Sequence, residues 1–570
     1  MKSQINHKTQ SGTQAAQNLA SWSGKLLAGI SIATGMLVLG SCKDVLDLKP
    51  LNAYSESDVW TDPNLVQVYV NGIYDQTVLA YKDGGFGWGA QTDELYGNFN
   101  WTNENSYVQG EATADNQTSS SLNRWGDLYG SIRKCNVFLS KAGQLDTVAN
   151  GQAVRTMRGE VHFLRALAYF ELLKRFGGVP LITKVYDVND KAFDEKRASW
   201  TETQNFILAD IAEAARLLPA AYAADIDKGR ATIGAALALK SRLMLYAASP
   251  YFNTSGDKKL WQQAKEAAKA VIDFKGAPYS LYGSAGNGTY NKTYLDFFNP
   301  EVIFARVYSG LARADRYNTV SRDLSPNGYE GYSAYNVIQQ MVDAFEMADG
   351  TPFSWTNPVH AKNPYANRDP RFYATILANN QLFKGRTTQF FEGGDDSPQS
   401  PYSPWNASKT RYVIRKMVDE SVDWQKQDYA ASQWVGFRLS EIYLNYMEAC
   451  AALGEDGEAL AYLNKLRSQK AGMPPVNASG TALMDKIRQE RRIELCFEGH
   501  RYFDIRRWGI AETGSKDALG VIITRQPDGT FTYQSATVQK RVWIPALYFY
   551  PIPRTELQRN PALTQNPNYN

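Results

Sequence analysis

The sequence predicts an all-α dominated fold in which antiparallel helix pairs form a scaffold and long irregular segments lie between them. The first observation behind this prediction is a proline-free stretch, Arg155–Phe176, with apolar residues at helical spacing. The second is a series of further helical patterns that follow one another in pairs. The third is a set of long segments rich in glycine, asparagine and aromatic residues. With 570 residues, the chain has the length of two to four domain-sized units.

The stretch Arg155–Phe176 carries two apolar stripes instead of one. A helix with two stripes is covered on two sides, as in a stack of helices. The run Gly177-Gly178-Val179-Pro180 ends this predicted helix. One stripe consists of Met157, Val161, Leu164, Ala168 and Leu172, and the other of Phe163, Leu167, Phe170 and Leu173.

Further helices are predicted in pairs along the chain. Three of them cover Thr203–Leu218, Thr232–Ala248 and Trp261–Phe274. The clearest pair joins Leu439–Leu453 to Gly457–Arg467, with Ala459 and Ala461 as small residues where the two helices approach closely. Such antiparallel pairs are typical of tetratricopeptide-like units, although no strict repeat of about 34 residues is legible.

Composition and charge exclude several classes of protein. The formal net charge of +3 gives no basic field for nucleic acid and no acidic tail. A hydrophobic content of 44% with 21% charged residues excludes a disordered chain. Cys135, Cys450 and Cys496 each lie in an apolar helical pattern, so we expect buried thiols. Without a CxxC or HExxH motif, neither a metal site nor a cofactor is predicted.

The first 41 residues have the pattern of an export signal. They contain lysines but no acidic residue, and Leu26–Leu39 is apolar but too short to span a bilayer. The following Leu39-Gly40-Ser41-Cys42 resembles the lipobox of bacterial lipoproteins, in which the cysteine is acylated and becomes the first residue of the mature chain. The alternative is ordinary secretory cleavage beside an incidental cysteine.

Three long segments between the helices are expected to be ordered and functional. They are Tyr81–Gln117, Tyr308–Tyr335 and Asn380–Lys409. A disordered segment would be poor in aromatic residues, whereas the first two carry many rings. The run Gly85–Gly89 lacks the strand–turn–helix context of a dinucleotide-binding loop and is interpreted as a glycine-hinged loop. The rings are Phe86, Trp88, Tyr96, Phe99, Trp101, Tyr317, Tyr329 and Tyr332.

A dense mixed-charge segment near the C-terminus admits two interpretations. Two of its acids could act as a general acid and base, as in glycosidases. The favoured interpretation is a clamp, because neighbouring arginines lower the pKa of the acids and pair with them. The segment contains Glu490, Arg491, Arg492, Glu494, Glu498, Arg501, Asp504 and Arg506.

Taken together, these motifs resemble the SusD/RagB family of outer-membrane lipoproteins involved in nutrient uptake. The resemblance extends over nearly the whole mature chain, and the motifs follow in the family's order. They are Leu46–Pro50, Glu160–Ile182, Asn299–Arg306, Met341–Gly350, Asn367–Phe372, Arg438–Glu448, Ile487–Trp508, Tyr550–Arg554 and Asn560–Tyr569.

The resemblance implies a binding protein and not a catalyst. Family members are lipid-anchored on the outer face of the outer membrane and pass oligosaccharides, or in some cases peptides, to a SusC-type TonB-dependent transporter. A peptide-binding protein is therefore the main alternative, ahead of a glycoside hydrolase or a tetratricopeptide-type adaptor. The implied organisation is a removed signal peptide (1–41), an N-terminal helical domain (42–300) and a C-terminal domain (301–570). The fold implied is a helix-pair scaffold with an irregular subdomain that carries the ligand.

The same resemblance implies which residues bind the ligand. In the starch-binding prototype, an arc of aromatic rings and nearby Asn and Asp side chains hold the sugar. By position, the corresponding loops are Asp83–Asn105, which contains Asp93-Glu94-Leu95, and Tyr317–Tyr335. Rings could cover the apolar CH face of a sugar while amides and carboxylates bind its hydroxyls. The predicted ligand residues are Asp83, Trp101, Asn103, Tyr317, and Tyr329 or Tyr332.

Overall fold

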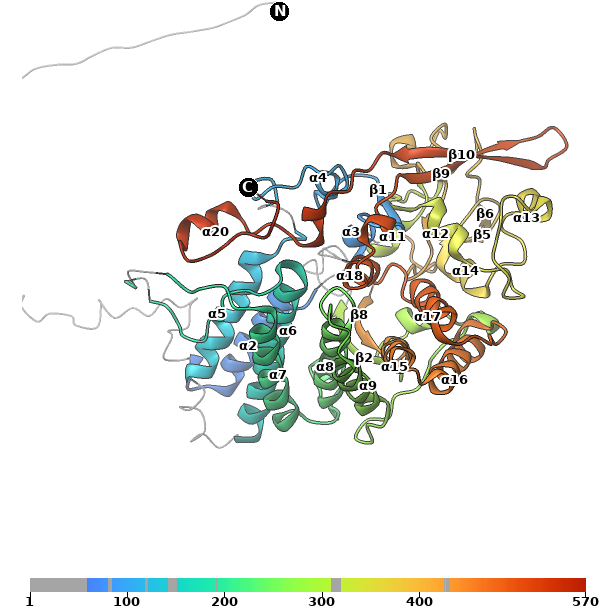
Figure 1. Ribbon diagram of the computed structural model, residues 1–570. Helices are drawn as coiled ribbons and strands as arrows, with labels where there is room; N and C mark the ends of the chain where they lie inside the picture. The colour runs from blue at the N-terminus through green and yellow to red at the C-terminus, as the bar shows by residue number, and fades with distance from the viewer. Residues whose placement is uncertain are drawn as a thin grey trace, which may run out of the picture. The chain divides into compact units, whose positions relative to one another are not determined.

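Helices supply most of the regular structure, as the sequence predicts (Figure 1). The computed structural model describes residues 59–79, 85–117, 121–141, 151–187, 189–190, 193–308, 319–424, 426 and 431–569. The longer helices are α2 (Pro63–Thr77), α5 (Trp125–Lys141), α6 (Gly151–Phe176), α7 (Trp200–Leu217), α8 (Ile233–Ala248), α9 (Lys258–Ile272), α15 (Leu439–Leu453), α16 (Asp456–Leu466) and α17 (Gly480–Glu494). The shorter ones are α3 (Phe86–Gly89), α4 (Glu104–Val108), α10 (Lys292–Leu295), α11 (Val320–Leu324), α12 (Gln339–Ala344), α13 (Pro358–Lys362), α14 (Pro370–Thr375), α18 (Arg501–Arg507), α19 (Ala511–Gly514) and α20 (Arg554–Arg559).

Helix α6 is the centre of the N-terminal helix stack, between α5 and α7 (Figure 1). From Phe163 to Phe176, every side chain except that of Arg165 is buried. This confirms the prediction of a helix covered on two sides. At Gly159, a Cβ atom would lie 2.9 Å from Cβ of Leu217 and 3.1 Å from the backbone nitrogen of Leu218, so glycine permits the close approach of α7.

The predicted helix boundaries hold to within a few residues, and capping explains where they shift. Helix α7 begins three residues before the predicted Thr203, because Ser199 and Glu202 form a capping box at its start. Helix α8 begins after Thr232, whose side chain accepts a hydrogen bond from the N–H of Ala235. Helix α15 begins and ends as predicted.

The predicted pair α15–α16 forms, with one correction. Leu463 and Leu466 of α16 are buried, as is Ala459. Ala461 is exposed, so the prediction that it marks a close approach between the helices was wrong. The pair continues the stack, because α15 also packs against α9 and α17.

Antiparallel two-stranded sheets hold the irregular part of the chain together, and the sequence did not predict them. The longest pairs are β2 (Val302–Tyr308) with β8 (Ser432–Arg438), and β9 (Ala518–Arg525) with β10 (Phe531–Gln539). The short strands are β1 (Leu95–Gly97) with β3 (Tyr335–Val337), β4 (Ile376–Leu377) with β7 (Val413–Ile414), and β5 (Leu382–Phe383) with β6 (Arg386–Thr387).

A second core, rich in aromatic rings, packs the segments that the sequence analysis expected to be ordered. It includes Phe86, Tyr335 and Trp434, and the ring centroid of Phe86 lies 5.4 Å from that of Tyr335. The run Gly85–Gly89 was predicted as a hinged loop, but it forms the buried helix α3. A Cβ atom on Gly87 would come within 2.6 Å of the Thr102 hydroxyl oxygen, so this helix needs glycine in order to pack.

The three described cysteines, Cys135, Cys450 and Cys496, are buried and not paired in disulfides, as predicted. Burial raises the pKa of the Cys450 and Cys496 thiols to about 12. Within the described residues, no helix is both long enough and apolar enough to cross a bilayer. The predicted export signal and Cys42 lie outside the described residues.

We expect Leu463→Ala to lower the free energy of unfolding by about 2–5 kcal/mol, because it leaves a cavity between α15 and α16. Urea unfolding followed by circular dichroism measures the change. Leu382, which is exposed, provides the matched control: Leu382→Ala should change the same quantity by no more than about 0.5 kcal/mol. Equal losses in the two variants would contradict the assigned packing.

Candidate ligand-binding surface

Four of the six predicted ligand residues lie in the described part of the chain. Asp83 and Tyr317, like the lipidation site Cys42, lie outside it. The four belong to two segments, the turn between β1 and α4 and the stretch between α11 and β3. They are Trp101, Asn103, Tyr329 and Tyr332.

Trp101 is an exposed ring on a well-supported turn. Its side chain is 49% exposed. The ring of Phe99 stacks on it, with centroids 5.2 Å apart and planes at 19°. The ring of Tyr335, from β3, contacts it edge-on at 6.4 Å. Two neighbouring rings therefore fix Trp101 while half of its surface reaches solvent, which is the arrangement that stacking on a ligand requires.

The amide of Asn103 is used within the turn itself. The residue has a left-handed backbone with φ of 57°. Its Nδ2 donates to the carbonyl of Asn116 at 3.0 Å, and its Oδ1 accepts from the Ser106 hydroxyl at 3.3 Å. These contacts hold Asn103 as part of the framework that supports Trp101.

Tyr329 and Tyr332 are packed more deeply than Trp101. Both are partly buried against the second core. The Tyr329 hydroxyl donates to the carbonyl of Arg386 at 2.9 Å, and the Arg386 guanidinium lies 4.0 Å from the centre of the ring. The guanidinium of Arg322 lies 4.7 Å from the centre of the Tyr332 ring. These contacts are those of rings in a protein core rather than of rings that face a ligand.

Two further exposed rings, Tyr402 and Trp405, lie near this region and were not predicted as ligand residues. Tyr402 is 54% exposed and Trp405 is 71% exposed. They lie on the run Ser400-Pro401-Tyr402-Ser403-Pro404-Trp405, within the third irregular segment. The alternation of proline with aromatic residues was the available signal, because proline favours surface turns, and Trp405 lies in the short 3-10 turn Pro404–Asn406.

Hydrogen bonds join the segments that carry these exposed rings. Nδ2 of Asn98, three residues before Trp101, donates to the carbonyl of Ala407 at 3.4 Å. Nζ of Lys409 donates to the hydroxyl of Tyr96 at 3.0 Å. Nδ2 of Asn327 donates to the carbonyl of Tyr402 at 2.7 Å. The irregular segments therefore meet close to the exposed rings, and we call Trp101, Tyr402 and Trp405 the aromatic surface.

A groove of about 560 Å³ lies between α2, β2 and the turn before α8. It carries charges of both signs, since Arg306 Nη2 pairs with Asp75 at 2.6 Å across it. Ile226 on its rim is 92% exposed. Its described lining reaches Val78 and Tyr308, the residues from which the chain continues toward Asp83 and Tyr317.

A charge clamp forms, as expected, but its central cation is not an arginine of the mixed-charge segment: it is Arg438, at the end of β8. Its guanidinium donates to the carboxylates of Glu498 at 2.7 Å and of Glu301 and Glu494 at 2.8 Å. Burial alone would raise the pKa of Glu494, but Arg438 and Arg371 outweigh it and hold the pKa at about 2.

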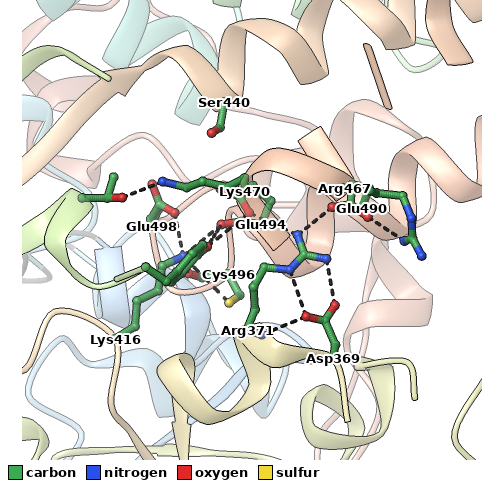
Figure 2. A network of polar contacts seen from close by, with 12 residues as sticks. Asp369, Arg371, Lys416, Ser440, Arg467, Lys470, Glu490, Glu494, Cys496 and Glu498 are labelled. Atoms are coloured by element: carbon green, nitrogen blue, oxygen red, sulfur yellow. Dashed lines mark hydrogen bonds and ion pairs between the residues drawn. The ribbon is translucent and has the colours of Figure 1, made fainter. Parts of the chain in front are cut away.

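The same network continues around Glu494 and Glu498. Figure 2 shows Arg371 directed toward Asp369, and Lys416 beside Cys496. Nη1 of Arg371 also donates to Glu490 at 2.6 Å, and Nζ of Lys416 to Glu498 at 2.7 Å. Because these acids are buried and paired with cations, they form the clamp that was favoured over a hydrolytic acid pair.

A helix-pair scaffold that carries a ring-packed irregular part and an aromatic surface defines a class of helical binding proteins. Two family models identify the family. A model described as "SusD family" matches residues 300–569. A second, described as "Starch-binding associating with outer membrane", matches residues 44–245. The chain belongs to the SusD/RagB family, which confirms the resemblance seen in its motifs. The predicted division of the mature chain at residue 300 stays a prediction.

Relatives and solved structures agree with this assignment. SusD-like protein P38 of Formosa agariphila is 23% identical over 497 residues, covering 82% of this chain and 88% of the relative. The crystal structure of a SusD-like protein from Bacteroides fragilis is 29% identical, with a TM-score of 0.77, over 91% of this chain and 100% of that chain. A SusD-like carbohydrate binding protein from the same species shares the fold at 24% identity, with a TM-score of 0.73, over 89% of this chain and 99% of that chain.

We expect Arg438→Leu to lower the free energy of unfolding by about 3–5 kcal/mol, because it leaves several buried carboxylates without their common partner. Urea unfolding measures the loss. Arg554, whose ion pair with Asp115 is exposed, is the control, and Arg554→Leu should cost less than about 1 kcal/mol. Similar values for both variants would show that the buried network does not hold the fold.

Proposed function

We propose that this protein is a non-catalytic, lipid-anchored protein of the cell surface that binds oligosaccharides and delivers them to a SusC-type TonB-dependent transporter in the outer membrane. The observation that carries the proposal is the aromatic surface. A protein gains nothing for its own stability by holding large rings in water, so three such rings on segments that hydrogen bonds join point to a ligand. The description of the matching N-terminal family model, which names starch binding and the outer membrane, supports the same function.

The geometry suits sugars in particular. The CH faces of a pyranose ring are apolar and flat, and an indole that is fixed on one side can cover them. Phe99 and Tyr335 fix the Trp101 ring before ligand arrives, so little freedom is lost when a sugar stacks on it. Asp83 and Tyr317 complete the proposed set of ligand residues, Asp83 as an acceptor for sugar hydroxyls and Tyr317 as a further stacking ring.

Peptide binding is the second candidate, and the groove beside β2 favours it. A peptide presents charges and apolar side chains in alternation. The groove offers Asp75, Arg230 and Arg306 together with the exposed Ile226. A neutral glycan would make only hydrogen bonds to these groups, whereas a peptide would also form ion pairs with them.

We expect Trp101→Ala and Trp405→Ala each to weaken glycan binding about tenfold or more, since one stacking ring contributes about 1–3 kcal/mol. Calorimetry of the soluble 43–570 chain with a glycan panel measures the affinity, and product analysis of the same mixtures detects turnover. Phe193, exposed at a separate site beside Tyr186, is the matched control, and Phe193→Ala should bind normally. Binding of peptides alone would favour the second candidate, and any turnover would contradict the non-catalytic proposal.

We expect Cys42→Ala to release the exported protein from the outer membrane, because Cys42 is the proposed acylation site. Membrane fractionation and immunoblotting measure the shift to the soluble fraction, in a strain without the partner transporter so that only the lipid retains the protein. Cys135→Ala, which changes a buried thiol, should leave the protein in the membrane fraction. Retention of the Cys42→Ala protein in that strain would contradict the lipid anchor.

A further inference from the structure

Beneath Trp101 lies a carboxyl group that the proposed function does not use. Glu104 begins α4 and is only 1% exposed. Its Oε2 accepts two hydrogen bonds from Thr102, from the backbone N–H at 3.1 Å and from the hydroxyl at 2.6 Å. Asn103, between the two residues, has the left-handed backbone that turns the chain back on itself. A buried carboxyl thereby fastens the residue next to Trp101.

The other oxygen of this carboxyl is buried without a hydrogen-bond partner among the described residues. The space that it occupies exists because residue 97 is glycine. A Cβ atom on Gly97 would lie 1.9 Å from Oε1 of Glu104. An ionised carboxylate in this position would leave one charged oxygen neither solvated nor bonded, which is costly in a protein interior.

Few charged or titratable groups face Glu104 from the surrounding elements. Tyr335 of β3 interacts electrostatically with Glu104, and its hydroxyl also shares a hydrogen bond with the Thr102 side chain. Arg541, after β10, is the nearby cation, but its guanidinium donates to the carbonyls of Thr92 and Leu95. Burial raises the pKa of Glu104, and the hydrogen bonds from Thr102 oppose that rise only in part.

We propose that Glu104 is the positioning residue of the aromatic surface: its protonated carboxyl, bonded to Thr102, holds the Trp101 turn in place, and its ionisation releases the turn. In the protonated state, Oε2 still accepts from Thr102 and Oε1 carries no charge. Ionisation spreads a negative charge over both oxygens, and the share on Oε1 has neither a hydrogen bond nor water, so the turn must open to admit water. The part of this inference that concerns ligand binding rests on the proposed function, because Trp101 is the ring that would stack on the sugar.

The direction of the pH dependence follows from the raised pKa. Below the ordinary pKa of a glutamate the carboxyl is neutral in every state, and the turn is fully held. As the pH rises through the raised pKa, the folded turn has to accommodate an ionised carboxylate, and its stability falls. Glycan affinity should therefore be highest in mild acid and should decline as the pH rises.

The test observes Trp101 directly, without a ligand. The exported Cys42→Ala protein is labelled with 5-fluorotryptophan, and the ¹⁹F signal of Trp101 is assigned by its loss in Trp101→Phe. We expect this signal to shift as the pH is raised from about 4 to about 9. Glu104→Gln, whose amide mimics a protonated carboxyl, should keep the signal at its low-pH position throughout. Glu104→Ala should displace it at every pH.

Glu94 supplies the matched control. Its carboxyl is also buried, and burial together with Asp93 raises its pKa to about 8. It lies against Gly89 and makes no hydrogen bond to Thr102 in the described structure. In Glu94→Gln, the Trp101 signal should titrate as in the parent protein. If it instead stops titrating there, or if Glu104→Gln titrates like the parent, the inference is overturned.

A binding measurement separates this inference from the proposed function. Maltoheptaose affinity of the parent protein should fall about tenfold or more across the titration, and that of Glu104→Gln should stay constant. If the Trp101 signal follows Glu104 but no glycan of the panel binds at any pH, the positioning role stands and the proposed function fails. If glycan binds but neither Glu104→Ala nor pH moves the Trp101 signal, the positioning role fails and the proposed function stands.

Discussion

The buried guanidinium of Arg438 is the constraint on which the arrangement of the protein depends. It stands where β8 ends and α15 begins, so it belongs to both the irregular part and the helix stack. Through Glu301 it holds the start of β2, and through Glu494 and Glu498 it holds the end of α17 and the turn after it. Ions buried away from water each need an oppositely charged partner. These segments therefore have one mutual arrangement in which every charge of the network is compensated. The helix stack alone would not specify where the irregular segments lie.

The ring-packed second core builds on that constraint. The ion pairs around Arg438 fix one end of the irregular part. Its long turns between short strands stay ordered through ring contacts and side-chain hydrogen bonds. The turn of Trp101 is one example, since Phe99, Tyr335 and Asn103 support it from three sides. Tyr329 serves the same purpose elsewhere, held by Arg386 and Phe383. Supporting rings are buried and the rings proposed to face the ligand are exposed, although both come from similar sequence.

Local patterns in the sequence predicted the helices, because a helix depends on residues close in the chain, and they predicted that the acids near α17 pair with cations. Helix α15 was predicted to the residue. The acids of α17 do pair with cations, but with Arg371 and Arg438 from distant segments instead of the neighbouring arginines that were expected. The pairing of β2 with β8 was not predicted, since the strands are more than a hundred residues apart and no turn links them. For the same reason, Tyr329 could not be distinguished from Trp101: its partners Phe383 and Arg386 lie in another segment. Trp405 was not predicted because the family resemblance pointed to two loops, whereas Trp405 lies in the third irregular segment.

The wide spacing of the charged partners also determines the order in which parts of the chain can fold. The helix pairs α6–α7 and α8–α9 join neighbouring segments and can form early. The ion pairs of Glu301 form only after Arg438 and Lys470 are present, and that of Arg371 with Glu490 only after α17 is present. Until those residues appear, the unfinished C-terminal half carries solvated charges along segments that later become interior. The irregular part therefore reaches its final arrangement only once the stretch around α17 is present to complete these pairs.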